Sequence, residues 1–227
     1  MPEMVYPKLF IPGPTEVSDE VRLAQANRVI GHRTKDMSEL YGGIVEKLQK
    51  LFNTKHHCMV VTSSGTGVME GTIRCLANKT VLHGACGAFG KRWYQISLAN
   101  GKEAEMVWAD WGKAVKPEMI AEKIEKGKYE LVAVTHNETS TGVRNPTDEI
   151  AKIAKENDAL IAIDAVSSLG GDLIDVNKYD VVVSSSQKAF ALPPGLAFAI
   201  VSEEAIEKAK KVENRGYYFD FINLLKR

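Results

Sequence analysis

The sequence predicts an α/β fold in which a mainly parallel β-sheet is covered by helices on both faces. Short apolar runs typical of strands alternate with stretches whose apolar residues recur at helical spacing. The strand-like runs lack a strict alternation of polar and apolar residues, which indicates strands that are buried on both sides. A chain of 227 residues is long enough for one sizeable core, or for one large domain and part of a second.

Strands are expected at residues 58–62, 131–135, 159–163, 181–183 and 196–201, and helices between them. An apolar stripe predicts a helix over 38–52. The helical spacing of Val68, Met69 and Ile73 predicts a second helix around these residues. Thr147 is expected to cap a third helix, which carries Ile150 on its apolar face. Residues 219–227 have a further helix-like pattern without a stop signal, so we expect the chain to end inside an element.

Residues 1–30 are predicted to form an N-terminal arm, and residues 31–227 the main domain. The first stretch has few strand signals and carries Pro7, Pro12, Gly13 and Pro14, so we expect an extended conformation there.

Charge and composition favour small-molecule chemistry. Lys+Arg and Asp+Glu both number 29, whereas nucleic acid or an anionic membrane as the main partner requires a basic excess. No signal peptide and no apolar segment of membrane-spanning length is found, so a soluble, cytoplasmic protein is expected. Cys58, Cys75 and Cys86 are expected to be reduced thiols, and no metal site is expected.

Four groups of residues follow predicted strands, which is where ligands bind in α/β sheets. They are the turn at 63–67, the loop at 137–142, Asp164 and Lys188. The small residues of the turn allow an anion to approach a helix N-terminus, although such a turn is more often a simple cap. Asp164 would reach the rim of the sheet, or only cap a loop. Lys188 has small and apolar neighbours, and burial lowers a lysine pKa and frees the amine as a nucleophile.

A phosphate cradle, a carboxylate and a lysine some two dozen residues later match the three anchoring needs of pyridoxal 5'-phosphate (PLP). The chain resembles the class V, fold-type I aminotransferases, specifically the alanine–glyoxylate / serine–pyruvate aminotransferase family. The matching motifs are IPGPT at 11–15, GHR at 31–33, SGTG at 64–67, ETSTGV at 138–143, DAVSS at 164–168 and SQKA at 186–189. The resemblance implies the PLP-binding large domain of this fold, without the C-terminal small domain that carries the substrate-binding arginine in relatives.

The resemblance also implies a role for each matching residue. Lys188 would hold the cofactor as a Schiff base and then move the substrate proton, and Asp164 would pair with the pyridine N–H. The other implied contacts are Ser64, Gly65, Thr66 and Gln187 at the phosphate, Phe89 and Val166 on the two faces of the ring, and Thr139 at the ring hydroxyl, with Ser140 as the alternative.

The implied activity transfers an amino group from a small amino acid, serine or alanine, to a 2-keto acid, glyoxylate or pyruvate, in a homodimer. Phosphoserine or aspartate remain open as substrates. Cysteine desulfurase is less favoured, because the histidines usual in those enzymes are replaced by Gln187 and Phe89. A truncated, non-catalytic module for PLP binding or dimerisation is the alternative of a different class.

Overall fold

The centre of the protein is a seven-stranded sheet with the strand order β1-β9-β8-β7-β4-β2-β3. The computed structural model describes residues 7–125 and 127–226. The strands are β1 (His57–Thr62), β2 (Thr80–Ala85), β3 (Glu103–Trp108), β4 (Leu131–Thr135), β7 (Leu160–Asp164), β8 (Val181–Ser185) and β9 (Leu196–Val201). Neighbouring strands pair in parallel except at β9, which is antiparallel to β1 and to β8. The prediction of a mainly parallel α/β sheet is therefore confirmed.

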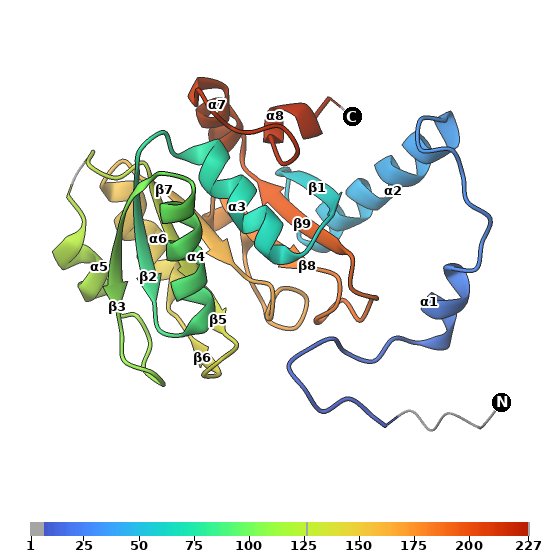
Figure 1. Ribbon diagram of the computed structural model, residues 1–227, viewed down its shortest axis with the longest axis horizontal. Helices are drawn as coiled ribbons and strands as arrows, with labels where there is room; N and C mark the ends of the chain where they lie inside the picture. Colours follow the sequence, from blue (N-terminus) through green and yellow to red (C-terminus); the bar gives the residue numbers. More distant parts are fainter. Residues whose placement is uncertain (1–6, 126, 227) are drawn as a thin grey trace.

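Helices cover both faces of this sheet (Figure 1). One face carries α3 (Gly65–Leu76), α4 (Ala88–Ala99), α7 (Glu203–Lys211) and α8 (Phe221–Leu224). The other face carries α2 (Lys35–Leu51), α5 (Pro117–Lys123) and α6 (Thr147–Glu156). The 3-10 helix η1 (Val176–Lys178) precedes β8. Burial on both faces explains why the strand sequences show apolar runs without alternation.

The side chains of the sheet divide between two apolar cores. Ile73 and Trp93 pack with one core, and Ile120 and Ile150 pack with the other. A short antiparallel hairpin of β5 (Asn137–Glu138) and β6 (Val143–Arg144) follows β4 and projects beyond the end of the strand (Figure 1). Among the described residues, no helix combines the length and apolar character that crossing a membrane requires.

The N-terminal segment differs from the extended arm expected from its prolines. Residues 7–34 run outside the body of the protein and include the helix α1 (Asp19–Ala24) (Figure 1). Residues 1–6 of the expected arm lie outside the described residues. The arm is thus partly helical, because Ser18 accepts a hydrogen bond from Val21 N and caps the helix.

Two helix starts also differ from expectation. The helix α2 begins at Lys35, three positions before the expected start, because Thr34 already has the extended backbone of an N-cap residue. Thr147 is the first residue of α6 and does not cap it. Its hydroxyl lies 2.9 Å from Tyr179 Oη in the core, so it is engaged away from the helix terminus.

Candidate active site

The nine residues singled out by the sequence all lie in β7 or in the segments that follow the carboxyl ends of β1, β2, β4, β7 and β8. These ends share one edge of the sheet, because the five strands run in the same direction. Asp164 is the last residue of β7 and pairs with Thr135 at the end of β4. This edge is therefore the candidate site.

Asp164 is almost completely buried, and its Oδ1 accepts a hydrogen bond from Val166 N at 3.0 Å. Loss of water raises the pKa of the Asp164 carboxyl to about 6, and the nearby Glu138 charge acts in the same direction. The charges of Arg92 and Lys188 partly oppose the rise in pKa. A cationic partner beside Asp164 would therefore lower this pKa and favour the ionised carboxylate.

Lys188 lies in the loop from β8 to β9, partly buried beneath the N-terminal segment. Its Nζ donates a hydrogen bond to Pro12 O at 2.8 Å. Thr15 fastens the segment to the lysine loop, since its N donates to Gln187 O at 3.1 Å and its hydroxyl to Lys188 O at 2.9 Å. Burial lowers the pKa of the Lys188 amine, and the Asp164 charge opposes this shift. The amine is therefore shifted toward its nucleophilic, neutral form.

The N-terminus of α3 faces the same edge. Gly65 is its first residue, and Ser64 at the N-cap makes no side-chain capping bond; Gly67 N donates to Ser64 O, whereas the N–H groups of Gly65 and Thr66 have no partner among the described residues. A Cβ on Gly65 would lie 2.6 Å from Val166 Cγ2, which requires glycine at this position. Arg92 Nη1 donates to Thr66 Oγ1 at 3.4 Å. Helix dipole, free N–H groups and a guanidinium together favour an anion here.

Phe89 and the loop between β5 and β6 complete the site. Phe89 is the second residue of α4, and its ring lies 4.6 Å from the Arg92 guanidinium carbon. The Ser140 hydroxyl donates to Glu138 Oε1 at 2.7 Å and accepts from Ala88 N at 3.0 Å. Within the described part of the chain, no partner is found for the hydroxyl of Thr139. Between the two candidates for a ligand contact, Thr139 thus has the free hydroxyl.

Sequence reasoning gave no role to Glu138, Arg92 or Thr135. Glu138 opens the matched motif at 138–143, which is a signal that could have singled it out. Arg92 follows Phe89 by three positions, so both share one face at the start of a helix. Thr135 is the last residue of a predicted strand, and this position at the strand end could have singled it out.

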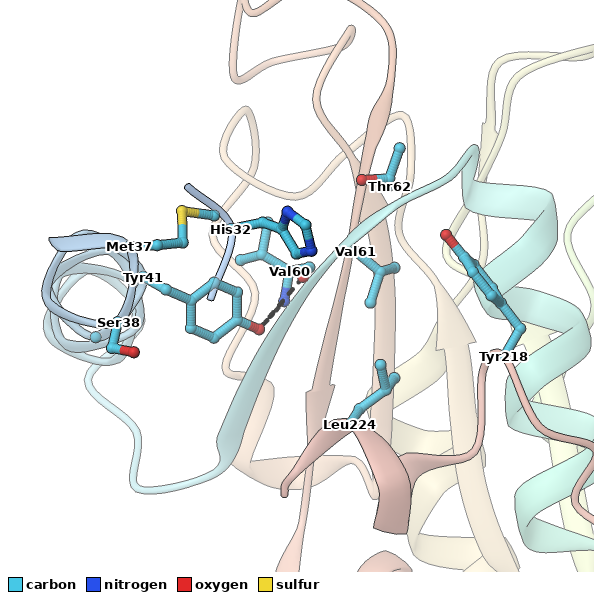
Figure 2. A pocket seen from close by; sticks show the side chains of 10 residues that line it. His32, Met37, Ser38, Tyr41, Val60, Val61, Thr62, Tyr218 and Leu224 are labelled. Carbon is cyan, nitrogen blue, oxygen red and sulfur yellow. Dashed lines mark hydrogen bonds between the residues drawn. The ribbon is translucent and has the colours of Figure 1, made fainter. Parts of the chain in front are cut away.

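A cavity of 340 Å³ lies beside the end of β1 (Figure 2). It is lined by residues of the segment before α2, of α2, of β1 and of the C-terminal segment: His32, Met37, Ser38, Tyr41, Gly42, Val60, Val61, Thr62, Tyr218 and Leu224. Figure 2 shows Tyr41 reaching β1, where its hydroxyl donates to Val60 O at 3.2 Å and accepts from Val60 N at 3.0 Å. Asp164 and Lys188 are not part of this lining. Tyr41 thus covers part of the outer edge of the sheet.

The three cysteines are buried and unpaired. Burial raises the pKa of the Cys58 thiol to about 11 and of the Cys75 thiol to about 12, and also raises that of Cys86. A thiolate nucleophile is disfavoured at all three positions, which argues against desulfurase chemistry by these residues.

Comparison with known proteins agrees with this geometry. The chain is 44% identical over 220 residues to an uncharacterized aminotransferase of Methanocaldococcus jannaschii, with 94% of this chain and 57% of that protein covered. It is 33% identical to the serine–glyoxylate aminotransferase of Hyphomicrobium methylovorum, with 98% of this chain and 58% of the relative covered. The chain therefore spans somewhat more than half the length of these relatives.

A solved structure shows the same fold. The alanine–glyoxylate aminotransferase of Nostoc sp. superposes with a TM-score of 0.91 at 28% identity, covering 100% of this chain and 63% of that one. The model of the family described as aminotransferase class-V matches residues 16–227. With its sheet, its edge site and this match over nearly the whole sequence, the chain belongs to the class-V aminotransferase family.

Proposed function

We propose that the chain forms the PLP-binding part of an aminotransferase that moves an amino group from serine or alanine to glyoxylate or pyruvate. The observation that carries the proposal is the meeting of three groups at one edge of the sheet. They are the buried carboxyl of Asp164, the desolvated amine of Lys188 and the uncapped N-terminus of α3. A pyridine nitrogen, an aldehyde and a phosphate are the three groups of PLP that such partners bind.

Two orphaned hydroxyls provide an independent test of the fit. Thr135 Oγ1 and Ser185 Oγ are buried and make no hydrogen bond in the described protein. Thr135 pairs with Asp164, and the two side chains point to the same face of the sheet. Ser185 lies near the start of α3, since its Cβ is 3.8 Å from the position that a Cβ on Gly65 would take. Since buried polar groups are rarely left without partners, these hydroxyls support a polar ligand at this edge. The residues fit PLP.

When bound, PLP supplies an electron-withdrawing ring that stabilises negative charge at the substrate α-carbon. Lys188, whose amine has a lowered pKa, would hold the cofactor through its Nζ and would move the α-proton of the amino acid. Asp164 would accept a hydrogen bond from the ring N–H and would hold the proton on that nitrogen. The Arg92 charge beside Thr66 adds to the positive potential around the phosphate.

The remaining contacts hold and cover the cofactor. Ser64, Gly65, Thr66 and Gln187 would bind the phosphate, Phe89 and Val166 would cover the two faces of the ring, and Thr139 would bind the ring hydroxyl. The choice of Thr139 is supported by the Ser140 hydroxyl, which is already engaged by Glu138 and Ala88. Small amino acids and 2-keto acids are the proposed substrates.

We further propose a cytoplasmic homodimer in which residues 31–227 form the PLP-binding domain and residues 1–30 an arm. Support for the dimer comes from the exposed apolar residues of the N-terminal segment, including Phe10 at 92% and Val29 at 99% exposure. In the proposed dimer these side chains would be buried against the partner subunit. The three free thiols agree with a reducing compartment.

Chemical trapping of the cofactor tests the proposal. The protein is incubated with PLP, reduced with borohydride and digested, and the peptides are analysed by mass spectrometry. The pyridoxyl group is expected on Lys188 and lost in Lys188→Ala, whereas Lys152→Ala, at an exposed position of α6, keeps it. Labelling spread evenly over the surface lysines would contradict the proposal.

The amino donor is tested separately by half-reactions. Serine, alanine, phosphoserine and aspartate are each mixed with the PLP-loaded protein, and the fall in the visible absorbance of bound PLP is followed. Serine and alanine are expected to react fastest. A faster reaction with phosphoserine or aspartate would replace the proposed substrate class while leaving the PLP site intact.

A further inference from the structure

The Glu138 carboxylate joins two walls of the site. Glu138 is completely buried at the end of β5. Its Oε2 accepts hydrogen bonds from Phe89 N and from Gly90 N, both at 3.0 Å. Its Oε1 accepts from Ser140 N at 3.1 Å and from the Ser140 hydroxyl at 2.7 Å. One side chain thus holds the start of α4 and the loop after β5.

These bonds supply the capping that α4 lacks locally. Gly87 at its N-cap has no side chain to accept from the first turn, so a carboxylate 48 and 49 positions further along the sequence takes this role. A negative charge is also favourable at this end of the helix dipole. The approach is close: a Cβ on Gly87 would lie 2.5 Å from Glu138 Cγ.

We propose that Glu138 is a positioning residue that fixes Phe89, on one face of the bound ring, relative to Thr139, at the ring hydroxyl. Phe89 lies in the capped first turn of α4, and Thr139 lies between Glu138 and Ser140, which are hydrogen-bonded to each other. The inference deepens the proposed PLP site and rests on it, because this positioning has a function only if a ring binds between these residues.

Glu138 also acts on Asp164 through space. Asp164 faces the Glu138 charge, which raises its pKa, and the Arg92 and Lys188 charges, which lower it. A neutral side chain at position 138 would remove the repulsion that disfavours ionised Asp164, so its pKa would fall. A residue that acted only as structural support through uncharged packing would leave this titration unchanged.

The variant Glu138→Gln keeps the size of the side chain and removes the charge, and its amide nitrogen cannot accept from two facing donors. In the cofactor-free protein, hydrogen exchange of the Phe89, Gly90 and Ser140 amides should accelerate roughly tenfold or more, since bonds to a buried carboxylate are among the stronger ones. Affinity for pyridoxamine phosphate, which needs no covalent link to Lys188, should fall by roughly the same factor. The matched control is Glu149→Gln, at an exposed position in the first turn of α6.

The Asp164 carboxyl is followed by carbon NMR in the same cofactor-free samples, and its titration should move to lower pH in Glu138→Gln. An unchanged titration, or amide exchange that accelerates equally throughout the protein, would overturn the inference. If Glu138→Gln does not fold, Ser140→Ala replaces it, because this change removes one donor to Glu138 and the acceptor for Ala88 N. Unaltered exchange at Ser140 and unaltered pyridoxamine phosphate affinity in that variant would likewise overturn it.

The two proposals fail in different ways. A wild-type protein that does not bind pyridoxamine phosphate would count against the proposed function. The amide exchange and the Asp164 titration would still report on Glu138, because both are measured without any cofactor.

Discussion

Lys188 Nζ donates a hydrogen bond to Pro12 O at 2.8 Å, so the N-terminal segment lies directly on the amine. The contact leaves no room at the next residue, since a Cβ on Gly13 would lie 2.6 Å from the same nitrogen. The backbone of Gly13, with φ of +146°, is also one that residues with side chains rarely adopt. Position 13 therefore controls access to the lysine.

Gly13→Ala is expected to move the segment off Lys188 and to speed covalent uptake of PLP about tenfold, because backbone strain of about one to three kcal/mol opposes the covered state. Stopped-flow absorbance after mixing with PLP measures the rate. Gly112→Ala serves as a control, since Gly112 also has a positive φ but has open space around it. Equal rates in the two variants would contradict the expectation.

Gly65→Ala is expected to weaken PLP binding by roughly tenfold, because the new methyl group would overlap Val166 Cγ2 and displace the first turn of α3. Val166→Ala in the same chain should restore part of the affinity by removing the overlap. The double-mutant cycle is measured by equilibrium binding of PLP. A double variant as weak as the sum of the two single variants would show that the contact is not the cause.

Asp164→Asn is expected to change how the stability of the cofactor-free protein depends on pH. The folded-state pKa of Asp164 is raised from 3.8 to about 6, so its protonated form favours the folded state. This contribution is fully present below pH 4 and is lost as the pH rises through about 6. A shift of about two units corresponds to about 3 kcal/mol. Denaturant unfolding at pH 4 and pH 8 should show the loss in the wild type and not in Asp164→Asn.

Thr135→Val is expected to stabilise the cofactor-free protein by about 1 kcal/mol, since it removes a buried hydroxyl that has no partner. The same change should weaken PLP binding, because the hydroxyl is available to the ligand at this edge. Thermal unfolding and PLP titration measure the two effects. Stabilisation without loss of affinity would remove Thr135 from the site.

Val29→Asp is expected to weaken the proposed dimer by roughly tenfold or more. Val29 is exposed in the single chain, and a charged side chain at this position would be buried in the dimer interface. Sedimentation velocity over a range of concentrations measures the change. Leu173→Asp is the matched control, since Leu173 is 96% exposed and lies outside the N-terminal segment. A monomeric wild-type protein would refute the dimer directly.

The sequence predicted the central strands well, because these are continuous apolar runs. It missed β2 and β3 for a physical reason that is visible in their residues. His83 and Gly84 interrupt β2, and in the folded protein His83 is neutral, with burial lowering its pKa to about 3 and with Ser97 Oγ 2.8 Å from its Nε2. The strand β3 alternates charged and apolar residues at an exposed edge, where Glu105 binds Lys123 and Lys128.

Within the candidate site, residues that follow apolar strands were predictable, as Asp164 and Lys188 illustrate. The bonds of Glu138 were not, because its partners lie almost 50 positions away and the pairing depends on the order of the strands. The same holds for the contact between Pro12 and Lys188, which joins segments 176 positions apart. Local pattern reports which residues reach the edge of the sheet; the topology decides which of them meet.

The reversed direction of β9 has a consequence for the lysine. Because β9 returns beside β8, the loop that carries Lys188 leaves the sheet and re-enters it within ten residues, without a crossover helix. Ser186 closes its base, with its hydroxyl donating to Pro193 O at 2.6 Å and accepting from Leu196 N at 3.3 Å. Substitutions within this short connection can therefore change the position of the Lys188 amine. The sheet and the helix α3, which would hold the phosphate of the ligand, would stay in place.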